Sequence, residues 1–249
     1  MDLMLNGRTA IVCGASSGLG LAIAERLSGE GANVVAVARR RESLESEASR
    51  IGAVPRVADL SEEGAAGRVV DHTVSRFGGV DILVWNTGGP RPGSALEIDE
   101  HAAHDAFRTL LLPLVRMVGA AVPHLRRSPY GRIVAVTTTT VKEPTSLVAL
   151  SNLIRPGLTG YLKTLANELA PDGIAVNCVA PGRILTSRAR ELYPDGVPAD
   201  ATDDIPMGRF GTPDELAAVV CVCFLATPLA SYVTGTTIAV DGGLTRSML

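Results

Sequence analysis

Short apolar runs recur along the chain between longer segments with helical periodicity. The runs that favour strands are Thr9–Cys13, Asn33–Ala38, Val54–Val57, Asp81–Trp85, Arg132–Thr137, Ala175–Ala180 and Thr236–Val240. Several of them, including Ile82–Trp85, are apolar throughout, which is typical of strands covered by helices on both faces. The pattern predicts an α/β fold with a doubly wound, seven-stranded parallel sheet.

A single domain is predicted for residues 1–249, because no linker, internal repeat or low-complexity tract interrupts this alternation. The run Thr212-Pro213-Asp214-Glu215 has the form of a capping box and predicts a helix through Ala226. Residues Thr186–Ile205 form the only long region without strand character. We expect this region to be a flap over a site, because long irregular loops in compact domains usually carry function.

Composition and charge argue against some classes of binding partner. The formal net charge is -3, and the 23 lysines and arginines are scattered, which argues against nucleic acid or an acidic membrane surface. No apolar stretch reaches the length of about 18 residues needed to span a bilayer. The first residues also lack the basic and apolar regions of a signal peptide. We therefore expect no membrane partner and a cytoplasmic location.

Neither the cysteines nor the histidines suggest a metal site. The cysteines are predicted to be buried thiols rather than a disulfide framework: Cys13, Cys178, Cys221 and Cys223. His101 and His104 stand in a polar helix start, where solvation is the simpler interpretation than metal binding.

A glycine-rich turn follows the first predicted strand directly and leads into the helical run Leu21–Leu27. Glycines let the backbone approach a pyrophosphate closely, and the free N–H groups at the helix start attract the anion. A merely flexible turn is the alternative, but the strand before it and the helix after it favour a dinucleotide site of the Rossmann type. The residues expected to contact the cofactor here are Gly14, Ser16, Ser17, Gly18, Leu19 and Gly20.

The end of the second strand indicates which dinucleotide binds. An acidic residue there would bind the ribose hydroxyl of NAD, but the chain has Ala38, followed by Arg39 and Arg40. Guanidinium groups match the 2′-phosphate of NADP, so NADP(H) is the predicted cofactor. A solvated basic helix start is the alternative, and it can hold for Arg41 in either case.

Together with further motifs, the glycine spacing resembles the short-chain dehydrogenase/reductase family over essentially the whole chain. Within that family the chain is most similar to β-ketoacyl carrier-protein reductases, particularly a divergent branch. The closing segment from Tyr232 to Gly243 also fits the family pattern. The resemblance implies that Asp59 and Leu60 contact the adenine of the cofactor. It also implies that Asn86, Thr87 and Gly88 lie beyond the fourth strand in the cofactor site. Nicotinamide contacts are implied for Pro181, Gly182 and Thr186.

The residues that transfer protons in ordinary members of the family are replaced here. Counting along the chain places Thr138 at the serine position, Ser151 at the tyrosine position, Arg155 at the lysine position and Leu110 at the asparagine position. A serine hydroxyl is a far weaker acid than a phenol of pKa about 10, and arginine cannot relay a proton. Losing a general acid costs on the order of 10²- to 10⁴-fold in rate, so reduction is handicapped but not excluded.

Replacement proton donors are sought close to these positions. Lys142, four residues beyond Thr138, is the first candidate, and Tyr193 on the flap is the second. The alternatives are a solvated or ion-paired loop lysine and a tyrosine that only contacts the substrate as part of a lid.

Pro156 predicts a kink or a helix start, because proline disfavours helical geometry at the residue before it. A helix start would leave Ser151 and Arg155 on a loop. The structural alternatives for these two residues are a small polar residue that fills space and an arginine in an ion pair.

The leading hypothesis is an NADP(H)-dependent oxidoreductase that acts on a ketone or alcohol, either a small molecule or a carrier-bound acyl or polyketide-like substrate. The alternatives are a non-redox lyase, cyclase or isomerase on the same scaffold, and a catalytically silent NADP(H)-binding subunit. The segments Leu110–Val122 and Leu147–Leu169 are apolar around much of their circumference. The resemblance implies that they pack against copies of themselves in a homodimer or homotetramer.

Overall fold

The protein is represented by a computed structural model that describes residues 2–146, 148–186, 189, 197–218 and 225–247. Seven strands form one parallel sheet in the order β3-β2-β1-β4-β5-β6-β7, which confirms the predicted doubly wound architecture. The strands are β1 Thr9–Cys13, β2 Asn33–Ala38, β3 Val54–Val57, β4 Ile82–Trp85, β5 Arg132–Val136, β6 Ala175–Pro181 and β7 Thr237–Val240.

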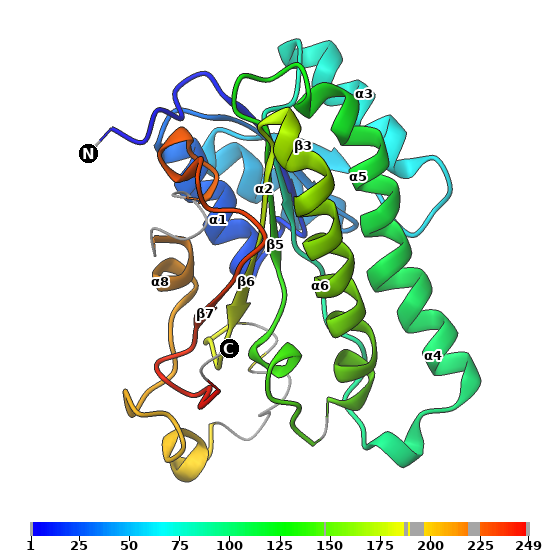
Figure 1. Ribbon diagram of the computed structural model, residues 1–249, viewed down its shortest axis with the longest axis vertical. Coiled ribbons are helices and arrows are strands. Elements are labelled where there is room, and N and C mark those ends of the chain that lie inside the picture. The colour runs from blue at the N-terminus through cyan, green and yellow to red at the C-terminus, as the bar shows by residue number, and fades with distance from the viewer. Residues whose placement is uncertain (1, 147, 187–188, 190–196, 219–224, 248–249) are drawn as a thin grey trace.

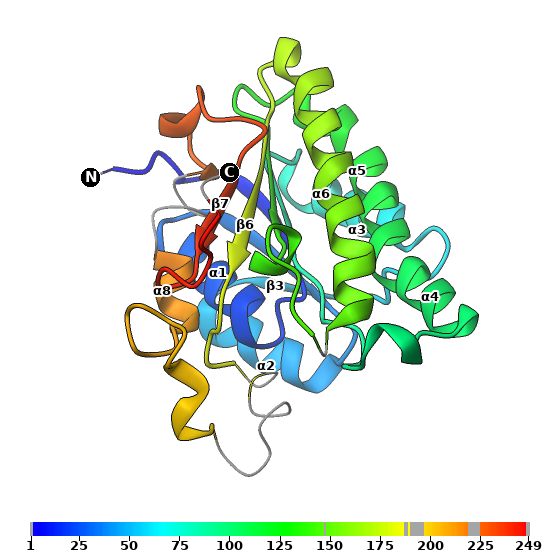
Figure 2. The ribbon, with the colours of Figure 1, turned by 60° about the horizontal axis from the view of Figure 1, so that its bottom comes forward.

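Helices cover both faces of this sheet (Figures 1 and 2). One core lies between the sheet and α1, α2 and α8, and a second core lies between the sheet and α3, α5 and α6. Burial on both faces explains why the central strands are apolar throughout. The helices are α1 Gly18–Gly29, α2 Arg41–Ile51, α3 Ala65–Phe77, α4 Glu100–Ala106, α5 Leu112–Leu125, α6 Ala149–Leu169 and α8 Pro213–Ala218, with a π-helical turn, η2 Phe107–Leu111, between α4 and α5.

The capping box predicted at the start of α8 forms. The backbone N–H of Thr212 donates to Glu215 Oε2 at 2.9 Å, and the N–H of Glu215 donates to Thr212 Oγ1 at 3.1 Å. These reciprocal bonds satisfy two of the N–H groups that a helix start leaves unpaired. The later part of this predicted helix, with Cys221 and Cys223, lies outside the described residues.

Helix α6 corrects one of the two expectations at Pro156, that of a helix start. The helix is continuous through the proline, so Ser151 and Arg155 lie on helix and not on a loop. Pro156 is exposed, while Leu158 and Leu162 on the inner face are buried against the sheet. Tertiary packing of this long apolar face outweighs the lost backbone bond, which costs about 3 kcal/mol.

The residues Glu100–Leu125 correct a second expectation. They form a helix of 26 residues that is long and apolar enough, by length and composition alone, to cross a membrane. Its apolar side chains Leu114, Met117 and Leu125 are buried in the core beside α3 and α6. Packing of this helix against the sheet therefore accounts for part of its apolar length, since 39% of its most apolar 18-residue window is buried.

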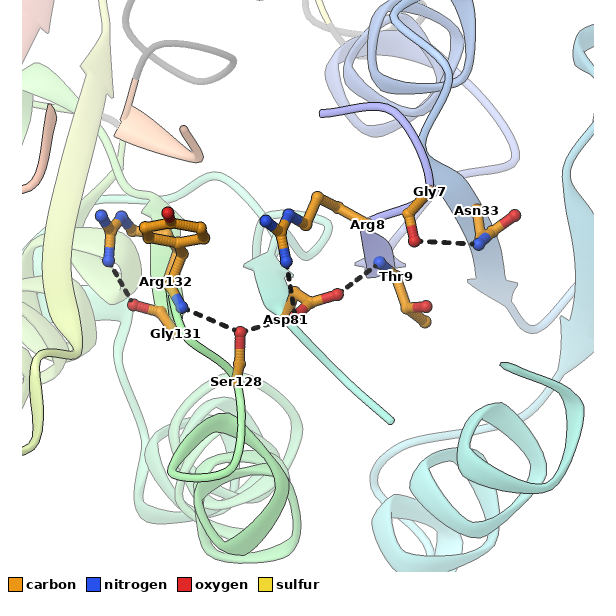
Figure 3. A network of polar contacts seen from close by, with 9 residues as sticks. Gly7, Arg8, Thr9, Asn33, Asp81, Ser128, Gly131 and Arg132 are labelled. Atoms are coloured by element: carbon orange, nitrogen blue, oxygen red, sulfur yellow. Dashed lines mark hydrogen bonds and ion pairs between the residues drawn. The ribbon is translucent and has the colours of Figure 1, made fainter. Parts of the chain in front are cut away.

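A polar network fixes the amino-terminal edge of the sheet (Figure 3). The Asp81 carboxylate accepts the N–H of Thr9 at 2.8 Å and the hydroxyl of Ser128 at 2.5 Å, and the Arg8 guanidinium lies 3.9 Å away. Arg8 also stacks over the ring of Tyr130 at 4.7 Å. These contacts join the starts of β1, β4 and β5. We therefore expect a ligand to bind at the opposite edge, where the carboxyl ends of the strands lie.

Candidate functional site

The carboxyl ends of β1 and β4 mark the candidate site. These strands are neighbours in the sheet, and the strand order reverses between them. In open α/β sheets, ligands bind in the crevice outside the carboxyl ends at such a reversal. The segments that follow β1 to β6, together with the first turns of α6, carry the residues that the sequence predicts for the site.

The glycine turn is packed so tightly that side chains cannot replace its hydrogens. Gly14 has φ +64°, and a Cβ on it would lie 2.7 Å from Asn86 Nδ2. A Cβ on Gly20 would lie only 2.2 Å from the carbonyl oxygen of Gly14. Gly18 has φ +57°, a conformation that favours glycine. The sequence pattern therefore corresponds to a real cradle of backbone atoms.

The amino terminus of α1 is open to an anion. Ser17 is its N-cap residue, but its side chain makes no capping hydrogen bond, and no acidic residue lies in the first turn. The first N–H groups of a helix point outward with a partial positive charge. Ser16, Ser17 and Leu19 are half-buried around this helix start, where a pyrophosphate would fit.

The arginines after β2 differ in their roles. Arg40 Nη2 donates to Ser17 Oγ at 3.4 Å, which places its guanidinium beside the glycine turn. Arg41 instead pairs with Glu45 one helical turn along, at 2.7 Å, as expected for a solvated helix start. Arg39 is exposed and acts electrostatically on Asp59. Arg39 and Arg40 are thus available to a 2′-phosphate, whereas Arg41 is engaged elsewhere.

Substituting Arg40 with alanine is expected to weaken NADPH binding by about 10- to 100-fold, because a charged hydrogen bond contributes about 1.5–3 kcal/mol. NADH lacks the 2′-phosphate, so its affinity should hardly change. Arg41→Ala is the matched control and should leave both affinities unaltered. Equal losses for NADPH and NADH in isothermal titration would contradict the assignment.

Asp59 and Leu60 lie half-buried in the loop after β3, on the side expected for the adenine. Burial raises the pKa of the Asp59 carboxyl, but hydrogen bonds from the hydroxyl and N–H of Ser61 and the positive charge of Arg39 outweigh it. The net pKa is below its ordinary value. Asp59 is therefore a fixed negative charge that holds its loop through Ser61 and attracts Arg39.

Asn86 connects β4 to the glycine turn. Its side-chain Nδ2 donates to the carbonyl oxygen of Gly14 at 3.4 Å. Thr87 is half-buried and Gly88 is exposed, so the backbone beyond Asn86 is partly accessible.

The loop after β6 reaches the glycine turn as well. A Cβ on Gly18 would lie 3.5 Å from Thr186 Cγ2, and a Cβ on Gly182 would lie 2.6 Å from Asp241 Cβ. Pro181 ends β6 and is buried. The structure therefore brings Pro181, Gly182 and Thr186 to the same edge as the glycine turn. Of the predicted flap, residues 187–188 and 190–196, with Tyr193 among them, lie outside the described residues.

Thr138 leaves β5 at this edge. Its Oγ1 accepts the N–H of Thr140 at 3.3 Å and so caps the short turn η3, Thr139–Val141. Because the bond uses the oxygen as acceptor, the hydroxyl hydrogen of Thr138 can point to a substrate oxygen. Lys142 ends the same turn, half-buried, and its charge acts on Asp241.

Arg155 is a buried cation held by backbone carbonyls. It is 8% exposed, its Nη1 donates to the carbonyls of Val136 and Thr137 at 3.2 and 3.3 Å, and its Nη2 donates to the carbonyl of Gly88 at 3.4 Å. Burial lowers the pKa of the guanidinium to about 10, so it stays charged at neutral pH. No carboxylate pairs with it among the described residues, which argues against the ion-pair alternative.

Ser151 lies one helical turn before Arg155, on the same buried face of α6. Arg155 reaches the end of β5 through its bonds to Val136 and Thr137, and Ser151 is buried on the same helix. Leu110, at the asparagine position, is buried in the π-helical turn and offers no polar group. At the four positions predicted from the sequence, the chain has two hydroxyl side chains, one buried positive charge and one apolar side chain.

Cys13 and Cys178 are buried thiols, as predicted. Burial raises the pKa of each to about 12, so both remain protonated and unreactive at neutral pH. We expect iodoacetamide at about pH 8 to spare both in the folded protein and to alkylate both in guanidinium chloride. Rapid labelling of Cys13 in the folded state, detected by peptide mass spectrometry, would contradict the packing of β1.

His104 lies 3.7 Å from Glu100 one helical turn away, at an exposed position on α4. Within the described ranges, no group of three or more histidine, cysteine, aspartate or glutamate side chains could hold a metal ion.

Sequence comparisons give the family. A family model described as enoyl-(acyl carrier protein) reductase matches residues 14–245. The 3-oxoacyl-[acyl-carrier-protein] reductase FabG of Escherichia coli (strain K12) is 33% identical over 240 residues, which cover 96% of this chain and 97% of that protein. The chain belongs to the short-chain dehydrogenase/reductase family.

Solved structures of similar proteins agree with this short-chain dehydrogenase/reductase assignment. L-sorbose reductase from Gluconobacter frateurii, complexed with NADPH and L-sorbose, is 31% identical and superposes with a TM-score of 0.92 over 100% of both chains. A short-chain oxidoreductase from Pseudomonas aeruginosa PAO1, described as containing an atypical catalytic center, is 28% identical with a TM-score of 0.91, over 98% of this chain and 99% of that one.

Proposed function

We propose that this protein is an NADP(H)-dependent oxidoreductase that transfers hydride between the nicotinamide and a carbonyl or alcohol substrate. The main support is the amino terminus of α1, which has no side-chain cap and follows the tightly packed turn Gly14–Gly20. Arg40 lies beside this turn, where it donates to Ser17. The similarity to FabG and to an NADPH-complexed sorbose reductase supports the same activity. A small ketone and a carrier-bound 3-oxoacyl group both remain within this proposal.

When bound, the cofactor supplies or accepts the hydride, and the protein has to position the substrate and manage its oxygen. Thr138 and Ser151 can donate hydrogen bonds to that oxygen, while the buried charge of Arg155 favours negative charge that develops nearby. Neither hydroxyl is acidic enough to replace a phenol as proton donor. The guanidinium of Arg155 donates its hydrogen bonds to backbone carbonyls. Positioning can still contribute roughly 7 to 11 kcal/mol, which makes slow turnover compatible with the site.

Deuteride transfer tests the proposal directly. Protein mixed with NADPH deuterated at the transferring position and a panel of 3-oxoacyl thioesters, ketoses and cyclic ketones should yield at least one alcohol that carries deuterium. A catalytically silent subunit would bind NADPH and transfer nothing. A non-redox enzyme would alter a panel member without consuming NADPH, so the three hypotheses give different results.

The same assay identifies the proton donor. If Lys142 supplies the proton, Lys142→Met should lower kcat by about 10²-fold or more, whereas Ser151→Ala should lower it only modestly. The reverse order would assign the role to Ser151. We further propose a cytoplasmic protein that forms a homodimer or homotetramer through α5 and α6, which light scattering tests.

A further inference from the structure

The carboxylate of Glu143 holds the end of the described chain. Its Oε1 accepts the backbone N–H of Arg246 at 2.8 Å and also the backbone N–H of Ser247, 103 and 104 residues further along the sequence. Bonds from backbone N–H groups to a carboxylate are roughly twice as strong as neutral ones. Because both donors belong to the main chain, the contact does not depend on the side chains of Arg246 and Ser247.

Glu143 is part of the turn that carries two candidate catalytic groups. The N–H of Val141 donates to the carbonyl of Thr138 at 3.2 Å, and the N–H groups of Lys142 and Glu143 donate to the carbonyl of Thr139 at 2.9 and 3.2 Å. A displacement of Glu143 would therefore move the backbone of Lys142 and the capped turn at Thr138.

The segment that Glu143 holds begins in a tight turn after β7. The Asp241 carboxylate accepts the N–H groups of Gly243 and Thr245, each at 2.9 Å. Burial raises the pKa of Asp241, but these bonds and the charge of Lys142 outweigh it, so the pKa lies below its ordinary value. The charge of Lys142 thus attracts this turn to the loop Thr138–Glu143. Glu143, in the same loop, is hydrogen-bonded to the segment that follows the turn.

The base of the flap rests on this turn as well. The N–H of Met207 donates to the carbonyl of Gly242 at 3.1 Å. A Cβ on Gly242 would lie 3.0 Å from Ile205 Cγ2, and a Cβ on Gly243 would lie 3.0 Å from Pro206 Cγ. Residues 205–207 therefore have little room to shift while residues 241–243 stay in place.

We propose that Glu143 is a positioning residue, and that its contact with the N–H groups of Arg246 and Ser247 is a latch. The latch joins the loop Thr138–Glu143, the segment Asp241–Ser247 and the flap base into one unit that forms a wall of the substrate site. This inference rests on the proposed function, which places substrate at this edge. NADP(H) would be held by other residues, so the latch should affect substrate and not cofactor.

Hydrogen exchange tests the latch without any need for turnover. In Glu143→Ala, the amides of Val141, Lys142 and Met207 should exchange about tenfold faster or more, the change expected from losing a charge-assisted bond. Arg246→Pro removes one donor N–H and should reproduce the effect. Arg246→Ala keeps the N–H and is the matched control, which should exchange like the wild type.

The double variant Glu143→Ala with Arg246→Pro should be no worse than Glu143→Ala alone, because both changes break the same link. If Glu143→Ala does not fold, Glu143→Gln retains an uncharged acceptor and should give a smaller increase in exchange at the same amides. NADPH affinity, followed by quenching of Trp85, the only tryptophan, should stay within about twofold of wild type, while KM for an acetoacetyl thioester rises.

Unchanged exchange at Val141, Lys142 and Met207 in both Glu143 variants would overturn the latch, and so would Arg246→Ala behaving like Arg246→Pro. A loss of NADPH affinity with an unaltered KM would overturn its assignment to the substrate wall. Absence of NADPH binding by the wild type would refute the proposed function instead, and the exchange result would still decide whether the latch exists.

Discussion

Gly20→Ala is expected to lower NADPH affinity on the order of 100-fold. The added Cβ would overlap the Gly14 carbonyl oxygen, which lies 2.2 Å from its position. The turn has to open, and the amides at the start of α1 then no longer converge on the pyrophosphate. Titration with NADPH followed by tryptophan quenching measures the loss.

Gly29→Ala is the matched control for this substitution. Gly29 ends the same helix, and a Cβ on it meets nothing within 4 Å. Its NADPH affinity should equal that of the wild type. A Gly20→Ala protein that binds NADPH normally would show that the turn is not the phosphate site.

Arg155→Ala is expected to lower the free energy of unfolding by on the order of 3 kcal/mol, because it leaves buried carbonyls unpaired and a cavity behind. The carbonyls of Gly88, Val136 and Thr137 would each lose the hydrogen bond that Arg155 donates. Turnover should fall with stability, since these carbonyls belong to the ends of β4 and β5 that frame the site. Urea unfolding measures the free energy of unfolding, and the deuteride assay measures turnover.

Arg155→Lys separates the contribution of the positive charge to stability from that of the hydrogen-bond geometry of the guanidinium. Lysine restores the positive charge, but its single nitrogen cannot span the carbonyls of two strand ends. We expect a stability between those of the wild type and the alanine variant. Arg127→Ala, at an exposed position, should unfold like the wild type. Wild-type stability in Arg155→Ala would contradict the carbonyl contacts.

The sequence allowed the sheet to be predicted almost residue by residue, because strands buried on both faces leave an unbroken apolar signal. It failed at Pro156, where local propensity predicts an interruption and the packed inner face of α6 keeps the helix intact. The glycine turn was predictable because its chemistry is contained within a few consecutive residues.

The contacts of Arg155 and Glu143 could not be predicted in the same way. Arg155 bonds to carbonyls on two strand ends, and main-chain acceptors leave no signal in residue type. Glu143 binds N–H groups more than a hundred positions away, again through the backbone. The sequence identified Arg155 by counting from a family pattern, but it gave no indication of Glu143, whose role depends on how β5 and β7 end at one edge.

The most direct test of the account compares NADPH with NADH by titration against the emission of Trp85, which is buried at the end of β4 next to Asn86. NADPH absorbs where tryptophan emits, so binding near β4 should quench the signal. We expect saturable quenching with NADPH at an affinity about 10- to 100-fold higher than with NADH. No quenching by NADPH up to about 1 mM, or equal affinity for the two nucleotides, would contradict it.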